Sequence, residues 1–214
     1  PFFLVVSIRA PHTPYPGDDG VPAWRKPHDP DAIPVPATAL DTPRFRLAHA
    51  RMYDAYSLAD DMVGVALDAL HDAGLSASTL VIVTSDHGPA LPASKGTLFE
   101  GGIHVPLVIR WPGVIAPGRS TDILVGGIDI LPTLLEVAGA PIHPQIQGRS
   151  FAKVLQGERE RLPPTSCSAS RRFWKATAIS PSERCAPTAT NTSALSGPIS
   201  SSETTRSNDG PRRC

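Results

Sequence analysis

The stretch from Thr79 to Pro112 constrains the fold more than any other part of the sequence. It opens with the apolar run 80–83, which is typical of a buried strand, and reads Asp86-His87-Gly88 where that strand should end. A loop containing Lys95 follows, and then a second apolar run from Val105 to Trp111. Polar groups thus lie at a predicted sheet edge, where open α/β sheets bind ligands. An Asp–His pair can bind a cation and a lysine can bind an anion, although Asp-His-Gly is also typical of a simple turn.

The flanking elements predict an α/β fold with a mostly parallel central sheet and flanking helices. Residues 2–8 are apolar except for Ser7, which predicts a buried strand. Asp41-Thr42-Pro43 predicts a helix start, and Gly74 predicts its end. A helix between two strands makes a βαβ unit, and hence parallel strands. The predicted apolar stripe of this helix consists of Met52, Ala55, Leu58, Met62, Val65 and Ala69.

Further along the chain, we predict a short strand over residues 122–127 and a helix that begins at Asp129 and ends at Gly139.

The 20 Lys and Arg residues balance the 20 Asp and Glu residues, so nothing favours a nucleic acid or an anionic membrane as a partner. The longest apolar runs are strand-sized, so we expect no membrane-spanning helix. Oligomeric state does not follow from the sequence.

The motifs together resemble the sulfatase family of the alkaline-phosphatase-like superfamily. They are Thr84-Ser85-Asp86-His87-Gly88, Lys95-Gly96-Thr97, Glu100-Gly101-Gly102, Val105-Pro106 and Trp111-Pro112-Gly113. Pro1-Phe2-Phe3-Leu4, Pro11-His12-Thr13-Pro14 and Gly148-Arg149-Ser150-Phe151 extend the resemblance to residues 1–157. The resemblance implies an alkaline-phosphatase-like sandwich, of which residues 1–157 are the C-terminal portion of the catalytic domain. Its closest likeness is to sulfatases that act on N-sulfated glucosamine.

The resemblance also implies roles for four residues. Asp86 and His87 would bind a divalent cation, usually Ca²⁺, and Lys95 would hold the sulfate. His12 would bind a sulfate oxygen and help to protonate the leaving group, which suits an imidazole because its pKa lies near neutrality. The substrate would be a small sulfated molecule such as a sulfated sugar, and the location would be periplasmic or secreted. The family nucleophile, a formylglycine made from cysteine, is expected in an N-terminal part that precedes Pro1. The chain alone is therefore expected to be an inactive fragment.

Residues 158–214 differ in composition from the rest of the chain. They are rich in Ser, Thr, Pro and Arg and lack apolar periodicity, which predicts disorder. Permitted codons for residues 182–194 can be read in another frame as RALRTDRYKYIR, similar to a strand that follows the sulfatase catalytic domain, so we hypothesise a frameshift between residues 158 and 170. Cys167-Ser168-Ala169-Ser170-Arg171 matches the formylglycine signal, but we interpret the match as coincidence because the family motif lies well before the other motifs.

Two alternatives stand beside the sulfatase interpretation. One is a phosphatase or phosphotransferase of the same superfamily, which zinc dependence and phosphate release would favour. The Lys-Gly-Thr and Glu-Gly-Gly motifs argue against it. The other is a non-functional gene fragment. Sequencing the flanking DNA would distinguish the fragment from a longer enzyme.

Overall fold

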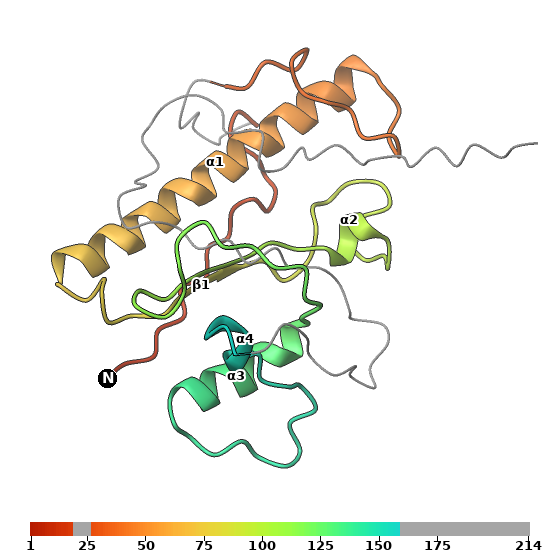
Figure 1. The fold of residues 1–214 in the computed structure, drawn as a ribbon. Helices are drawn as coiled ribbons and strands as arrows, with labels where there is room; N and C mark the ends of the chain where they lie inside the picture. Colours follow the sequence, from red (N-terminus) through yellow and green to blue (C-terminus); the bar gives the residue numbers. More distant parts are fainter. Residues whose placement is uncertain (19–26, 159–214) are drawn as a thin grey trace, which may run out of the picture. The chain divides into compact units, whose positions relative to one another are not determined.

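A computed structural model describes residues 1–18 and 27–158 (Figure 1). The elements in these ranges, in chain order, are α1 (Pro43–Asp72), β1 (Val81–Thr84), α2 (Glu100–Ile103), β2 (Leu107–Arg110), a 3-10 turn η1 (Gly127–Asp129), α3 (Ile130–Val137) and α4 (Ala152–Leu155). No helix in the described part of the chain has the length and apolar character needed to cross a membrane. The predicted tail, 158–214, lies outside the described residues apart from its first residue.

The long helix α1 has the bounds that its capping residues predict. The Thr42 side chain accepts a hydrogen bond from the Phe45 N–H, and Pro43 occupies the first turn. Gly74 follows the helix with a φ of 69°, a left-handed conformation that glycine adopts without steric cost. The predicted apolar stripe is wrong in its second half, where Met62 and Val65 are exposed. Among the described elements, no strand or other helix packs against α1 to cover that half.

The loop before α1 is bound to the first half of the helix by charged side chains. The backbone N–H and ring Nδ1 of His28 both donate to Asp54 Oδ1, at 2.9 and 2.6 Å. Arg51 Nη1 donates to Asp18 Oδ1 at 2.6 Å. Arg46 binds the Asp41 carboxylate. These contacts hold the loop on both sides of residues 19–26.

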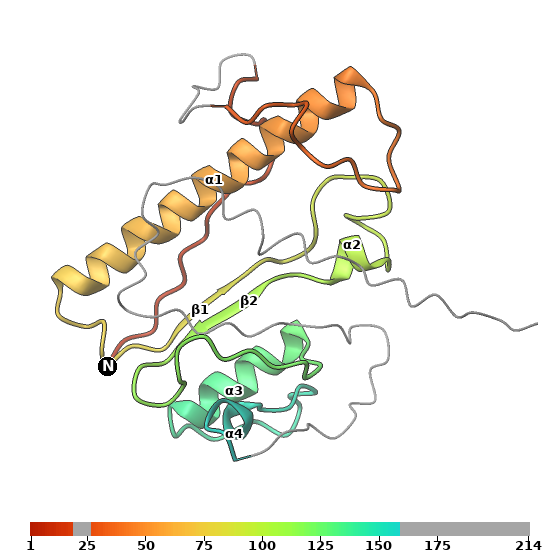
Figure 2. The ribbon, with the colours of Figure 1, turned by 45° about the horizontal axis from the view of Figure 1, so that its top comes forward.

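The two strands form an antiparallel pair, with Ile82 opposite Ile109 (Figure 2). The parallel pairing predicted for residues 2–8 and 80–83 is absent from the described sheet, because that sheet contains only β1 and β2 and residues 2–8 form no strand. A parallel partner requires a helical crossover, but the chain between β1 and β2 makes a loop and the four-residue α2 and then returns alongside β1. The described sheet is also much smaller than the predicted sandwich.

The apolar core lies beside this sheet. Leu107 and Ile109 of β2 are buried, while Val108 and Arg110, which alternate with them, are partly exposed, as the alternation of side chains along a strand requires. The core also contains Val105, Val125, Phe151, Val154 and Leu155. Residues 105–110 and 151–155, far apart in the sequence, therefore share one core.

A hydrogen-bond network connects α3 with the segment before α4. The buried Asp129 carboxylate accepts from the Gly126 and Arg149 backbone N–H groups, each at 2.8 Å. Thr133 Oγ1 donates to Asp129 O at 2.6 Å and accepts from the Phe151 N–H at 3.0 Å. The predicted helix from Asp129 to Gly139 is thus confirmed, with Asp129 as the cap residue of α3.

Two predicted strands are wrong. Residues 2–8 have no strand assignment, and their side chains are largely exposed, Phe3 by 76%. Their peptide groups make no backbone hydrogen bond to another described residue. Apolar composition alone does not make a strand, because a strand needs a hydrogen-bonding neighbour. Residues 122–126 are likewise irregular and lead into η1.

Candidate functional site

Asp86 and His87 lie just beyond β1, separated by Ser85 from the end of the strand at Thr84. Asp86 Oδ1 accepts from the His87 backbone N–H at 2.9 Å. The His87 ring donates from Nδ1 to the Gly88 carbonyl oxygen at 2.8 Å, which leaves Nε2 with a free lone pair when the ring is neutral. Nε2 and Asp86 Oδ2 are 3.4 Å apart. A carboxylate oxygen and an imidazole nitrogen therefore lie side by side.

This pair fits part of a cation site. Two ligands at right angles around one calcium ion, with bonds of about 2.4 Å, are separated by about 3.4 Å. A second hydrogen bond that fixes the ring of a metal-binding histidine is common in such sites, and the Gly88 carbonyl supplies it. Calcium takes about six to eight ligands, whereas the described residues contain no cluster of three or more His, Cys, Asp or Glu suited to a metal. Asp86 and His87 thus offer two of the groups that such a site needs, and their role as ligands stays a prediction.

The loop after His87 is closed by close backbone contacts. The Gly88 N–H donates to the Gly102 carbonyl oxygen at 2.9 Å. The buried Ser94 hydroxyl donates to the Gly101 carbonyl oxygen. A Cβ at Gly88 would collide with that same carbonyl and lie 3.0 Å from Ser94 Oγ. Glycine is therefore required at 88 for packing, and Ser94 lies directly against it.

Lys95 is held next to this contact. Its N–H donates to the Pro89 carbonyl oxygen at 3.0 Å, and its side chain is exposed. Because Ser94 lies against Gly88, the residues next to them in the chain, Lys95 and His87, are brought into the same neighbourhood. The ammonium group of Lys95 makes no ion pair with a carboxylate in the described ranges, so its charge is available to an anion.

His12 is exposed and lies in a turn, in which its backbone N–H donates to the Arg9 carbonyl oxygen at 2.9 Å. Its ring Nδ1 donates to the Thr13 carbonyl oxygen at 2.7 Å, so Nε2 is the atom that could exchange a proton with a ligand. Within the described ranges, the structure has no hydrogen bond or ion pair between His12 and Asp86, His87 or Lys95. The structure therefore associates three of the four predicted site residues through one loop, and the role of His12 stays a prediction.

Ser94 is the residue that sequence analysis missed. A single serine in a loop gives no signal of burial. The glycines at 88, 101 and 102 do give one, because three glycines around one loop suggest a close approach of backbone segments. Serine, which is small and can donate to a carbonyl, is the type of residue that fits there.

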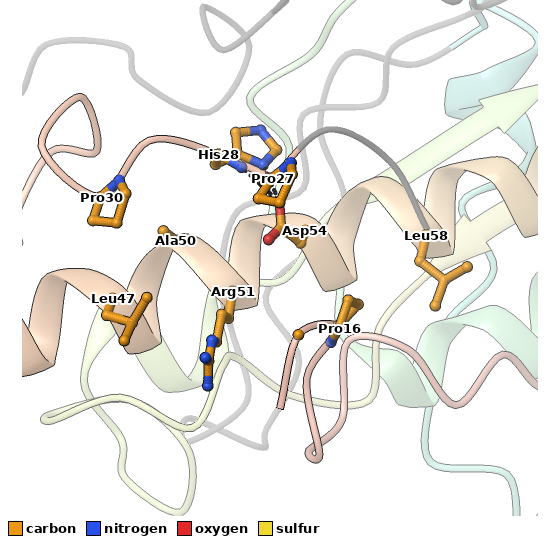
Figure 3. A pocket seen from close by; sticks show the side chains of 10 residues that line it. Pro16, Pro27, His28, Pro30, Leu47, Ala50, Arg51, Asp54 and Leu58 are labelled. Carbon is orange, nitrogen blue, oxygen red and sulfur yellow. Dashed lines mark hydrogen bonds and ion pairs between the residues drawn. The ribbon is translucent and has the colours of Figure 1, made fainter. Parts of the chain in front are cut away.

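A cavity of about 320 Å³ lies on the first half of α1, beneath the preceding loop (Figure 3). Its polar side chains are His28, Asp54 and Arg51, and prolines such as Pro16 and Pro30 form much of its wall. The neighbouring residues Trp24, Arg25 and Lys26 lie outside the described residues. His28 serves here to bind the loop to Asp54.

Comparison with known proteins identifies the family. The sulfatase family model matches residues 1–140 of the 214 residues. The chain belongs to the sulfatase family. The match contains His12, Asp86, His87 and Lys95, and it ends before Cys167, which lies outside both the match and the described residues.

Several curated sulfatases are similar to this chain. Human arylsulfatase A is 42% identical over 111 residues, covering 46% of this chain and 22% of that protein. Rat steryl-sulfatase is 35% identical over 128 residues, covering 51% and 22%. A sulfatase of Formosa agariphila is 40% identical over 124 residues, covering 48% and 22%. The chain therefore spans about a fifth of the length of these relatives.

Proposed function

We propose that residues 1–157 form part of a hydrolase of sulfuric esters or N-sulfates. The observation that carries this proposal is the sulfatase family match over residues 1–140, which includes all four predicted site residues. The geometry after β1 supports it, because Asp86 Oδ2 and His87 Nε2 are spaced as two ligands of one cation. The family fold implied for the whole enzyme is the alkaline-phosphatase-like sandwich.

In this proposal each residue acts on a different part of the sulfate group. Asp86 and His87 contribute to binding a divalent cation, Ca²⁺ by family resemblance, which withdraws charge from sulfate oxygens when bound. Lys95 places an ammonium beside the same anion, where charge must be stabilised in the transition state. His12 gives a proton to the departing oxygen or nitrogen from Nε2. The nucleophile, formylglycine by family resemblance, comes from a part of the enzyme other than residues 1–157.

Substrate and location are narrower proposals. The relatives include proteins named arylsulfatase A, steryl-sulfatase and ulvan-active sulfatase, so their names span several classes of sulfated substrate. The N-sulfated glucosamine of heparan-type sugars stays our prediction from the sequence around Asp86. A periplasmic or secreted location is proposed by family resemblance alone.

A chimera tests the function. Residues 1–157 replace the corresponding segment of the Formosa agariphila sulfatase, and the product is assayed for sulfate release from an aryl sulfate and from N-sulfated glucosamine. We expect turnover with the chimera and none with chain 1–214 alone. His12→Ala and Lys95→Ala in the chimera should each lower kcat/KM by about 100-fold or more.

Matched controls remove the same groups elsewhere: His143→Ala and Lys153→Ala change exposed residues and should leave turnover unchanged. A chimera that unfolds cooperatively on heating, and is therefore folded, but releases no sulfate contradicts the proposal. Faster release of phosphate from an aryl phosphate, restored by zinc, would favour the phosphatase alternative instead.

A further inference from the structure

We infer that Ser94 is a positioning residue for Lys95, through its buried hydroxyl. The inference rests on the proposed function of Lys95 as the anion-binding group. Ser94 is 3% exposed, and its hydroxyl donates to the Gly101 carbonyl oxygen. The bond joins the loop that contains Lys95 to the first turn of α2.

The Ser94 backbone is fixed as firmly as its side chain. Its carbonyl oxygen accepts from Thr97 Oγ1 at 2.7 Å and from the Thr97 N–H at 3.0 Å. The side chain and the carbonyl group of Ser94 thus bind Gly101 and Thr97, which both follow Lys95 in the chain. The Lys95 N–H is itself held by the Pro89 carbonyl oxygen at 3.0 Å. Lys95 therefore lies in a segment that is fixed at both of its ends.

The backbone around Ser94 adopts a conformation that requires such fixing. Ala93 has a φ of 53°, which few residues other than glycine adopt, and Gly96 has a φ of 76°. Two left-handed residues therefore bracket Ser94 and Lys95. A non-glycine residue in this region is strained, and such a conformation persists only where the surroundings hold it. The Ser94 hydroxyl, through its hydrogen bond to the Gly101 carbonyl oxygen, is the group that we infer holds this conformation in place.

The same bond connects Lys95 with the cation-binding pair. The Gly101 carbonyl that Ser94 binds lies against Gly88, the residue after His87, and Ser94 Oγ lies against Gly88 as well. Loss of the hydroxyl would remove the hydrogen bond that the Gly101 carbonyl accepts from Ser94, and the loop would be free to move away from Gly88. The distance between the Lys95 ammonium and the Asp86–His87 pair would then vary, and anion affinity would fall.

The experiment uses the full chain 1–214 with the series Ser94, Ser94→Cys and Ser94→Ala. A thiol is a weaker donor than a hydroxyl, so the cysteine variant should be intermediate. NMR hydrogen exchange measures protection of the Lys95 and Gly88 N–H groups. Titration with inorganic sulfate, followed by the Lys95 amide shift, measures anion affinity. We expect Ser94→Ala to lower protection at both N–H groups by about tenfold, equal to about 1.4 kcal/mol, and to weaken sulfate binding about fivefold or more.

Thr133→Ala is the matched control, because it removes another buried hydroxyl that donates to a backbone carbonyl. It should reduce stability without changing sulfate affinity, and unchanged exchange of β1–β2 amides shows that each variant is folded. Unchanged protection in Ser94→Ala, or lowered protection with unchanged sulfate affinity, overturns the inference. Lys95→Ala separates the two proposals: if it binds sulfate as well as the parent chain, or if the parent shows no sulfate-dependent shift, the assigned role of Lys95 fails as well.

Discussion

Replacement of Asp129 by alanine tests the network that holds α3 to the segment before α4. The carboxylate is 5% exposed and accepts two backbone hydrogen bonds of 2.8 Å, from Gly126 and Arg149. A hydrogen bond to a charged group contributes about 1.5–3 kcal/mol, and each buried N–H left without a partner costs about 1–3 kcal/mol. We therefore expect Asp129→Ala to lower the free energy of unfolding by about 3–5 kcal/mol, a large part of the roughly 5–15 kcal/mol typical of a domain.

Urea unfolding followed by circular dichroism measures this change. Asp129→Asn keeps one acceptor oxygen and should lose about half as much. Asp122→Ala removes an exposed carboxylate from the preceding segment and should change stability by less than about 0.5 kcal/mol. A loss below about 1 kcal/mol in Asp129→Ala, at an unchanged urea dependence, would refute the reasoning, because it would mean that the two N–H groups have other partners.

Three further predictions concern the site and α1. Ala93→Gly should raise the free energy of unfolding by about 0.5–1 kcal/mol in urea unfolding, since relief of the left-handed strain exceeds the added chain entropy; a destabilised variant would contradict this. Calcium binding by the chain, measured by calorimetry, should be on the order of millimolar or weaker and should weaken further in Asp86→Asn but not in the exposed control Asp72→Asn. Burial lowers the pKa of His49 from 6.5, so the unfolded state binds the proton more readily, and stability should be fully present above about pH 6.5 and fall as the pH drops through the folded pKa. His49→Phe should remove this part of the pH dependence of the unfolding midpoint, and an unchanged slope would show that another group causes it.

The sequence predicted those elements whose ends are set by local chemistry. Thr42 and Pro43 start α1, and Gly74 ends it, because capping and left-handed glycine act within a few residues. Whether residues 2–8 form a strand could not be predicted from local chemistry, since burial and strand pairing depend on neighbours distant in the chain. The direction of β2 relative to β1 likewise depends on the path of residues 85–106, which no short pattern specifies.

The candidate site shows the same division. The adjacency of Asp86 and His87 at the end of β1 follows from the sequence, and the structure adds the facing of Oδ2 and Nε2. The proposed proximity of Lys95 to this pair rests on the contact of Ser94 with Gly88, which only three-dimensional packing reveals. The contribution of His12 depends on contacts with the substrate, so it stays a prediction.

The exposed N-terminal segment, residues 2–8, has a practical consequence for work with this chain. An uncharged run of aromatic and aliphatic side chains, with peptide groups that make no backbone bond to another described residue, is a template on which a further strand can add. Samples should therefore cloud or form larger particles as they are concentrated, and light scattering should report this before any spectroscopic change in the helices. A lysine in place of Val5 would place a charge in the middle of the template and keep the solution clear at higher protein concentration.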